Sequence, residues 1–284
     1  MGKPHAESRE PMLDVAKNPE KSHAGGKILQ SVGDGVGIIT FNNPEKRNAM
    51  SLEMWEGLGS ALVELRDDPA VRVVILVGAG DKAFVSGADI SQFEKTRHNA
   101  AASEAYSKRS EAQRALLADY PKPTIACIRG FCLGGGMQLA MLADIRIASD
   151  SSQFGIPAAR LGIAYGYDGL RNLVSLVGPS WARLIMYTGM RIDAAEALRI
   201  GLVERVLPDA ELWDATMEIA RTISGNAPLA IKAAKISIAE VLKDPDKRDI
   251  DAIRKIGMAC MDSEDFREGR TAFMEKRRPQ FKGK

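Results

Sequence analysis

The sequence predicts an α/β core followed by a helical C-terminal region. Two segments, Val71–Val77 and Thr124–Ile128, are almost entirely apolar and rich in β-branched residues, which is typical of strands buried on both faces. Helical patterns lie between these segments along the chain, and from about Pro179 onward the pattern is helical throughout. Strands that alternate with helices predict a βαβ architecture.

The elements of the core are expected to start near residue 27. Two strands, Lys27–Val32 and Val36–Phe41, are joined by a glycine-containing turn. Ser51 can cap a helix over Leu52–Arg66, because its hydroxyl can accept a hydrogen bond from a free N–H of the first turn. The later core elements are expected, in chain order, at Val71–Val77, Asn99–Ala118, Thr124–Ile128, Gly134–Ala143 and Asp144–Ala148.

From about Pro179 onward the expected elements are helical, both in the last part of the core and in the C-terminal region. Asp193 can cap a helix over Ala194–Ile200, and Ser263 can cap the final helix. The helices that follow are expected at Ala210–Ser224, Leu229–Leu242, Lys247–Met261 and Glu264–Lys276. Residues 1–26 lack periodicity, so we divide the chain into a flexible extension of residues 1–26, a core of 27–205 and a helical region of 206–284.

The composition argues against several classes of function. The 284 residues include 39 Lys and Arg against 37 Asp and Glu, so no strong field favours nucleic acid or an anionic membrane. No apolar run reaches the roughly 18 residues that a membrane span needs. The polar start carries acidic residues, unlike a signal or transit peptide, and the three cysteines form no CxxC pair. We therefore expect a cytoplasmic protein in a reducing compartment.

Two glycine-containing segments follow the buried strands. Ala83–Ile90 comes after Val71–Val77, and Gly130–Gln138 comes after Thr124–Ile128. Small residues allow a ligand to approach the backbone, and a helix N-terminus offers unpaired N–H groups. If the two segments converge, their amides can form an oxyanion hole, in which one donor is worth roughly 3–4 kcal/mol of barrier. For either segment alone, tight packing of a turn is an equally good explanation.

Four motifs in register resemble the crotonase family, which comprises enoyl-CoA hydratases and isomerases. They are N-P-E-K-R-N-A-M at Asn43–Met50, A-F-V-S-G-A-D-I at Ala83–Ile90, G-F-C-L-G-G-G at Gly130–Gly136 and F-M-E-K-R-R-P at Phe273–Pro279. The resemblance covers the chain from about Lys27 to Phe281. It implies a crotonase-like spiral of ββα units, in which residues 206–284 form a helical trimerisation region.

The resemblance also implies roles for individual residues. The backbone N–H groups of Ala88 and Gly135 would hold the oxygen of an acyl-CoA thioester. The CoA moiety would lie against Lys46, Arg47, Ala49, Ala88, Asp89, Ile90 and Lys276, with the cations near its phosphates. Solvated surface charge explains those cations equally well. The family further implies a homotrimer or homohexamer, no metal, and no cofactor besides the CoA that enters with the substrate.

Both glutamates that hydratases of this family use are replaced. Gln138 stands two residues after the third glycine of G-G-G, and Ala158 follows the proline of the F-G-I-P segment. An amide cannot exchange a proton near neutral pH, and a methyl group has no polar atom. General acid–base help is worth about 10²–10⁴-fold. Hydration by the two-glutamate route is therefore not expected, and simple isomerisation is doubtful.

Decarboxylation of a malonyl-type thioester needs an enolate hole but no strong base. The segment Leu161–Leu173 is similar to methylmalonyl-CoA decarboxylase, with Tyr165 at that enzyme's tyrosine, although the decarboxylase has a histidine where this chain has Ala88. Tyr165 could bind the carboxylate or protonate the enolate, or it could simply pack its ring in a loop. Asp168 could face the site, or it could cap a helix over Gly169–Val177.

We therefore expect a carbon–carbon lyase whose candidate catalytic residues are Ala88, Gly135, Gln138, Tyr165 and Asp168. The alternatives are an atypical hydratase or isomerase, an acyl-CoA thioester hydrolase in which Asp168 activates water, and a catalytically degenerate protein that binds acyl-CoA or RNA. Ser–His–Asp hydrolases, Rossmann dinucleotide sites and metal sites are disfavoured, because the sequence lacks their motifs.

Overall fold

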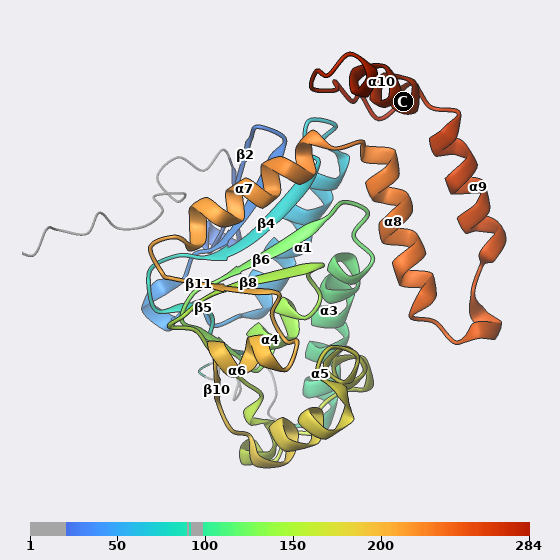
Figure 1. Cartoon of the computed structure of the whole chain (residues 1–284). Coiled ribbons are helices and arrows are strands. Elements are labelled where there is room, and N and C mark those ends of the chain that lie inside the picture. The colour runs from blue at the N-terminus through green and yellow to red at the C-terminus, as the bar shows by residue number, and fades with distance from the viewer. Residues whose placement is uncertain (1–20, 90, 92–98) are drawn as a thin grey trace, which may run out of the picture.

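The computed structural model describes residues 21–89, 91 and 99–284. These residues form two β-sheets, and the larger sheet lies at the centre of the molecule (Figure 1). The strands of this sheet lie in the order β1 (Lys21–His23), β2 (Ile28–Gly33), β3 (Val36–Phe41), β4 (Val73–Gly78), β6 (Thr124–Ile128), β8 (Ile145–Ser149) and β11 (Arg205–Leu207). The pairs β1–β2 and β2–β3 are antiparallel, and all pairs from β3 to β11 are parallel.

A smaller sheet lies beside the first and carries the functional segments. Its order is β10 (Ile192–Asp193), β9 (Gln153–Gly155), β7 (Phe131–Leu133) and β5 (Ala83–Val85). After each of β4, β6 and β8 the chain turns directly into β5, β7 or β9, which gives the strand–strand–helix repeat. The expected α/β class with ββα units is confirmed. The sequence analysis did not separate the small sheet, because strands of two or three residues show no periodicity.

The helices surround these sheets and extend beyond them. The α-helices of the described residues are α1 (Leu52–Asp67), α3 (Ala100–Ala118), α4 (Gly135–Ala140), α5 (Tyr167–Thr188), α6 (Ala194–Arg199), α7 (Leu212–Gly225), α8 (Pro228–Val241), α9 (Ile250–Met261) and α10 (Glu264–Met274). Short 3₁₀ helices are η2 (Ala24–Gly26), η3 (Pro44–Lys46), η5 (Pro157–Leu161) and η6 (Pro245–Lys247). No helix in these ranges is both long and apolar enough to cross a membrane.

The predicted caps are present at the helix starts. Ser51 accepts a hydrogen bond from the backbone N–H of Met54 at 3.2 Å, and Asp193 accepts one from Glu196 at 2.8 Å. The hydroxyl of Ser263 accepts from the N–H of Phe266 at 3.0 Å. Each cap satisfies one of the free donors of a first turn, which is why these helices start where the sequence predicts.

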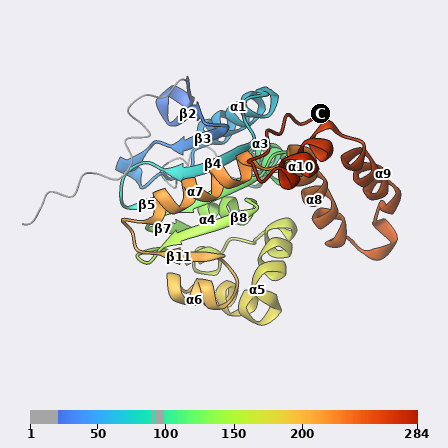
Figure 2. The same ribbon diagram turned by 45° about the horizontal axis from the view of Figure 1, so that its top comes forward.

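The larger sheet is buried on both faces. Along β4, Val73, Ile75 and Val77 pack in one apolar cluster with Leu212 of α7, while Val74 and Leu76 pack in another with residues of α1. Figures 1 and 2 show α7 lying across the strands. The alternation explains why β4 is apolar at every position, as expected for a strand covered on both sides.

Two of the expected boundaries are wrong. Residues 21–26 are not part of a flexible extension, because β1 pairs with β2 and η2 follows it; residues 1–20 lie outside the described residues. The core does not end at residue 205 either, because β11 continues the larger sheet to Leu207 and α7 covers that sheet. The region that stands away from the sheets therefore begins at α8 (Figure 1).

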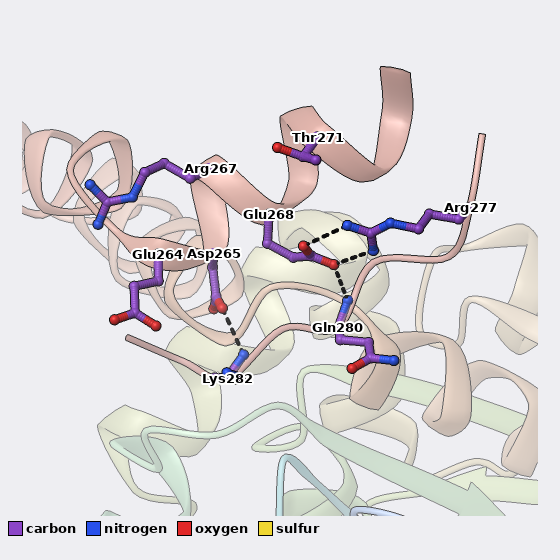
Figure 3. A pocket seen from close by; sticks show the side chains of 8 residues that line it. All are labelled: Glu264, Asp265, Arg267, Glu268, Thr271, Arg277, Gln280 and Lys282. Atoms are coloured by element: carbon purple, nitrogen blue, oxygen red, sulfur yellow. Dashed lines mark hydrogen bonds and ion pairs between the residues drawn. The ribbon is translucent and has the colours of Figure 1, made fainter. Parts of the chain in front are cut away.

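The last residues of the chain connect α10 to the core. The carboxylate of Asp265 accepts hydrogen bonds from the backbone N–H groups of Lys282 at 2.6 Å and Gly283 at 2.8 Å, and Arg72 of the core donates to the carbonyl of Phe281 at 2.6 Å. Beside them, Arg277 binds Glu268 in a polar pocket (Figure 3) and lowers the pKa of Glu268 to about 2. The carboxylates of Asp265 and Glu268 in this pocket are thus hydrogen-bonded to partners from the C-terminal segment itself.

Leu212→Ala tests whether α7 belongs to the core. Leu212 is fully buried, so the truncation should lower the free energy of unfolding by about 2–5 kcal/mol. The matched change Leu198→Ala, in α6, removes a side chain that is 43% exposed and should cost at most about 0.5 kcal/mol. Chemical denaturation followed by circular dichroism measures both; equal costs would show that α7 does not hold the sheet.

Candidate active site

The two glycine-containing segments meet at the small sheet. β5 and β7 pair in parallel, so the residues that follow them leave the sheet on the same side. Gly87 and Ala88 follow β5, while Gly134 and Gly135 follow β7. A Cβ built on Gly135 would lie 3.8 Å from the backbone nitrogen of Ala88. The expected convergence of the two segments is therefore present in the structure.

The backbone around Ala88 and Gly135 is held by hydrogen bonds in which the N–H groups of these two residues are not used. The N–H of Met50 donates to the carbonyl of Gly87 at 2.8 Å, and the N–H of Asp89 donates to the carbonyl of Met50 at 2.9 Å. On the other side, the N–H of Gly134 donates to Gly155 at 2.8 Å. Among the described residues, neither the Ala88 nor the Gly135 N–H has a backbone acceptor, and Gly135 is the first residue of α4.

Glycine is required here for two different reasons. Gly134 has a positive φ of 52°, a backbone conformation that is strained for a residue with a side chain. At Gly136 the reason is steric, because a Cβ there would lie 2.0 Å from the carbonyl oxygen of Val85. These glycines let α4 start directly against β5, which is what places the two amides together.

A cavity of about 830 Å³ adjoins the residues that carry these two amides. It is lined by all five candidate catalytic residues: Ala88, Gly135, Gln138, Tyr165 and Asp168. Ala158 of η5 also lines it. The positions that carry glutamates in hydratases therefore do face the cavity, and this chain presents an amide and a methyl group there.

Tyr165 lies in the loop before α5 and directs its hydroxyl inward. Its hydroxyl is buried and has no hydrogen-bond partner among the described residues. A Cβ on Gly169 would lie 2.5 Å from the Tyr165 ring and 3.0 Å from the Gln138 amide nitrogen, so Tyr165 and Gln138 flank the same point. Burial raises the pKa of Tyr165 above its ordinary value, and the charge of Arg114 only partly opposes this. The phenol is thus a protonated donor at neutral pH.

Asp168 is not the cap of its helix. The helix α5 begins at Tyr167 with Gly166 at the N-cap, so Asp168 is in the first helical turn. Its side chain is exposed and lines the cavity beside Tyr167, which is 76% exposed. The alternative in which Asp168 caps a helix over Gly169–Val177 is wrong. A carboxylate in the first turn is still favourable, because it faces the positive end of the helix dipole.

The residues expected to bind CoA are only partly gathered at the cavity. The ammonium group of Lys46 donates to Asp89 at 2.9 Å and to Ser91 at 2.9 Å, and the Arg47 guanidinium lies 5.4 Å from the centre of the Phe131 ring. Burial alone would raise the pKa of Asp89, but the hydrogen bonds from Ser91 and Lys46 lower it overall. This charged cluster adjoins Ala88 in the chain, although none of its members lines the cavity.

Three other residues of that expected set have different placements. Ala49 is buried at 8% exposure beside the cavity residue Met50. Ile90 lies outside the described residues. Lys276 follows α10 at the far C-terminal end and does not line the cavity of its own chain. A single chain therefore does not bring Lys276 to the site.

The wall formed by α3 was missed in the sequence analysis. Ser107, Glu111, Arg114 and Ala118 line the cavity and recur three or four residues apart, which is one face of a helix. Trp55 of α1 lies next to this wall. The spacing was visible in the sequence, but α3 is polar on several sides, so nothing local shows which side meets the cavity.

Comparisons with known proteins identify the relatives of this chain. A model of the enoyl-CoA hydratase/isomerase family matches residues 31–284. A short-chain-enoyl-CoA hydratase from Clostridium acetobutylicum is 38% identical over 252 residues, which is 88% of this chain and 95% of that protein. A crotonyl-CoA hydratase from Syntrophomonas wolfei is 37% identical over 256 residues, which is 89% of this chain and 97% of that protein.

Solved structures show the same relationship. An enoyl-CoA hydratase/carnithine racemase from Magnetospirillum magneticum has a TM-score of 0.87 at 35% identity, with 91% of this chain and 96% of that chain covered. An enoyl-CoA hydratase from Bacillus anthracis has a TM-score of 0.86 at 33% identity, with 91% and 100% covered. Sequence, fold and the converging amides lead to one conclusion: this chain belongs to the enoyl-CoA hydratase/isomerase family.

Proposed function

We propose that the protein is a carbon–carbon lyase that decarboxylates a malonyl-type acyl-CoA thioester. One observation carries the proposal: Ala88 and Gly135 line the cavity with their backbones close together, while Gln138 and Ala158, at the two positions where hydratases carry glutamates, line the same cavity. A site of this kind can stabilise an enolate, but it cannot activate water through paired carboxylates. The reaction that best matches such a site is one that forms the enolate without removing a proton.

The proposed step balances without a metal or redox cofactor. The bond between the α-carbon and the carboxyl group breaks, CO₂ leaves, and the electron pair forms the enolate of the thioester. The negative charge settles on the thioester oxygen, where the N–H groups of Ala88 and Gly135 would donate to it. The buried hydroxyl of Tyr165 then supplies a proton to the α-carbon and regains one from water.

Hydration remains the second candidate function. It is favoured by the names of the two relatives, both of which are hydratases. Against it stand the amide of Gln138 and the methyl group of Ala158, neither of which can exchange a proton at neutral pH. The exposed carboxylate of Asp168 lies at the cavity wall and is the group that could support hydrolysis of the thioester instead.

Assays with four CoA thioesters distinguish decarboxylation from hydration. Malonyl-, methylmalonyl- and ethylmalonyl-CoA are assayed for CO₂ release, and crotonyl-CoA is assayed for hydration. We expect at least one malonyl-type thioester to be turned over faster than crotonyl-CoA, because only decarboxylation needs no base. Fast hydration of crotonyl-CoA with no CO₂ from the other three would overturn the proposal.

The double change Gln138→Glu and Ala158→Glu provides the control for that panel. It puts carboxylates back at the two positions that face the cavity. Hydration of crotonyl-CoA should rise by about 10²-fold or more, since paired acid–base groups contribute that much. A variant that folds and binds acyl-CoA but gains no hydration would show that the missing carboxylates do not limit this reaction.

Gly135→Pro tests the backbone donor itself. Proline is tolerated at the first position of a helix, so the change removes the N–H with little cost to α4. We expect kcat/KM for the best substrate to fall by about 10²–10³-fold.

Gly135→Ala is the matched control for the donor. Its added methyl group would lie at 3.8 Å from the Ala88 nitrogen, an ordinary contact, and the N–H is kept. It should lose less than about tenfold in kcat/KM, because the donor remains. Equal losses in the two variants, both shown to be folded by circular dichroism, would contradict the oxyanion role.

Tyr165→Phe tests the proton donor. The change removes only the buried hydroxyl, so kcat for CO₂ release should fall by about 10²–10⁴-fold. Because burial raises the pKa of Tyr165 above the ordinary value of about 10, the donor stays protonated and the wild-type rate should stay level between about pH 7 and about pH 9. Full activity in Tyr165→Phe would mean that the ring serves only for packing.

We also propose that the protein acts in the cytoplasm as a homotrimer or homohexamer. The support for the assembly is a set of exposed apolar side chains on and beside α8, α9 and α10, the helices that stand away from the sheets. Its exposed members are Ile238, Val241, Leu242, Ile250, Met258, Met261, Phe266, Phe273 and Met274. Large exposed apolar surfaces of this kind mark interfaces. In such an assembly, Lys276 would serve the CoA phosphates of a neighbouring copy.

A further inference from the structure

A second cavity, of about 370 Å³, lies between the core and the helical arm, which we define as residues 228–284. Its core wall comes from the end of α1, the start of β4, the segment before β6 and the end of α7. Its other wall comes from the start of α8, where the chain leaves the core (Figure 1), and from the C-terminal tail. The described residues that line it include none of those that line the active-site cavity, so the two cavities are separate.

Positive charge lines both walls of this second cavity. Asp67 is the one acidic residue in its described lining, and both of its carboxylate oxygens already accept hydrogen bonds from Arg66, at 2.8 Å and 3.1 Å. The excess of cations over carboxylates makes the cavity attractive to an anion. The cations of the described lining are Arg66, Arg72, Lys122, Lys232 and Lys282.

Two cations of the core wall are held in place by neutral groups. Arg72 donates to two backbone carbonyls, one from α7 at 3.1 Å and one from the tail at 2.6 Å. Lys122 donates to two carbonyls at the C-terminal end of α1, both at 2.7 Å. Burial lowers the pKa of Lys122, and the charges of Asp68 and Asp67 offset this only in part. A carbonyl orients a cation but carries no net charge, so a bound anion would still be stabilised here.

The cations of the arm wall differ in how far their charge is compensated. Lys282 acts on Glu268, because its charge helps to lower the pKa of that carboxyl group. Lys232 is an exposed residue of α8, and within the described ranges its ammonium group has neither a hydrogen bond nor an ion pair. Lys232 is therefore the arm cation that is best placed to meet an anion from outside the chain.

Apolar side chains line the cavity together with these cations. Val71 is 2% exposed, and Ile223, Leu229 and Ile231 contribute from α7 and α8. An inorganic anion gains nothing from such a surface, whereas an organic group attached to the anion would bury apolar area against it. The volume also lies within the range of about 300–1,000 Å³ that is usual for small-molecule sites.

We propose that this cavity binds a small organic phosphate, with the phosphate between Arg72, Lys122 and Lys232 and the organic group on the apolar residues. A phosphate carries about −1.5 to −2 charges near neutral pH and has several acceptor oxygens, so cations on two walls can contact it together. A carboxylate has one charge and two oxygens, and it matches this lining less well. The proposed site is independent of the reaction in the active-site cavity.

Such a ligand would connect the helical arm to the core. Cations on both walls repel one another across the cavity, and an anion between them replaces this repulsion with attraction to each wall. A ligand that binds the folded protein also raises its stability through mass action. Phosphate binding should therefore raise the midpoint of thermal unfolding as well as occupy the cavity.

Titration calorimetry of the whole protein with phenyl phosphate tests the proposal. Phenyl phosphate should bind with a Kd below about 1 mM, and inorganic phosphate should bind at least about tenfold more weakly because it lacks the ring. Leu229→Ser should weaken the binding of phenyl phosphate by about fivefold and leave that of inorganic phosphate within about twofold, since it removes apolar surface only.

Lys232→Glu tests the charge of the arm wall. Reversing this charge should raise the Kd for phenyl phosphate by at least about tenfold. Lys255→Glu is the matched control, because Lys255 is also an exposed lysine of the helical arm but lies on α9, outside the cavity. Its Kd should stay within about threefold of the wild type, since distant exposed charges are screened.

Three results would overturn the proposal. They are no binding of phenyl phosphate at about 1 mM, equal losses in Lys232→Glu and Lys255→Glu, and equal affinity for phenyl phosphate and inorganic phosphate. The second result would place the ligand elsewhere on the protein, and the third would remove the role of the apolar residues. None of these measurements needs turnover, so the outcome does not depend on which reaction the active site catalyses.

Discussion

The parallel pairing of β5 with β7 is the constraint on which the site depends. The two strands are only three residues long, yet their pairing sets the two chain segments that follow them side by side. Gly136 packs so closely on Val85 that a Cβ would reach the carbonyl oxygen. That close approach carries the first amide of α4 to the amide of Ala88, and both members of this pair are backbone groups.

A site made of backbone groups tolerates replacement of the side chains around it. Gln138 and Ala158 line the cavity, and their side chains take no part in the backbone hydrogen bonds that hold the two segments, among them that from the Gln138 N–H to the Gly134 carbonyl. In the proposed function, the two amides are kept while the proton chemistry in the cavity changes. This separation is the physical basis for the lyase that we propose in a family with relatives named hydratases.

The cavity also has two chemically different sides. On one side lie the small residues after β5 and β7, which present main-chain donors. On the other side lie α3, whose Arg114 is over the Trp55 ring, and the loop that carries Tyr165. In the proposed reaction, the main-chain donors of the first side meet the charge that develops on the thioester oxygen.

The sequence by itself determined the elements whose signals are local. The β-branched run of β4, the caps Ser51, Asp193 and Ser263, and the glycines before α4 each act within a few residues, so they predict the fold class and the two donor segments. Only the tertiary structure decided the rest. The packing of α7 on the sheet and the cavity face of α3 depend on contacts between segments far apart in the chain, which no local pattern encodes. The pairing of residues 21–23 with β2 and the first-turn place of Asp168 involve neighbouring residues, but a three-residue strand shows no periodicity and a glycine N-cap offers no side-chain signal.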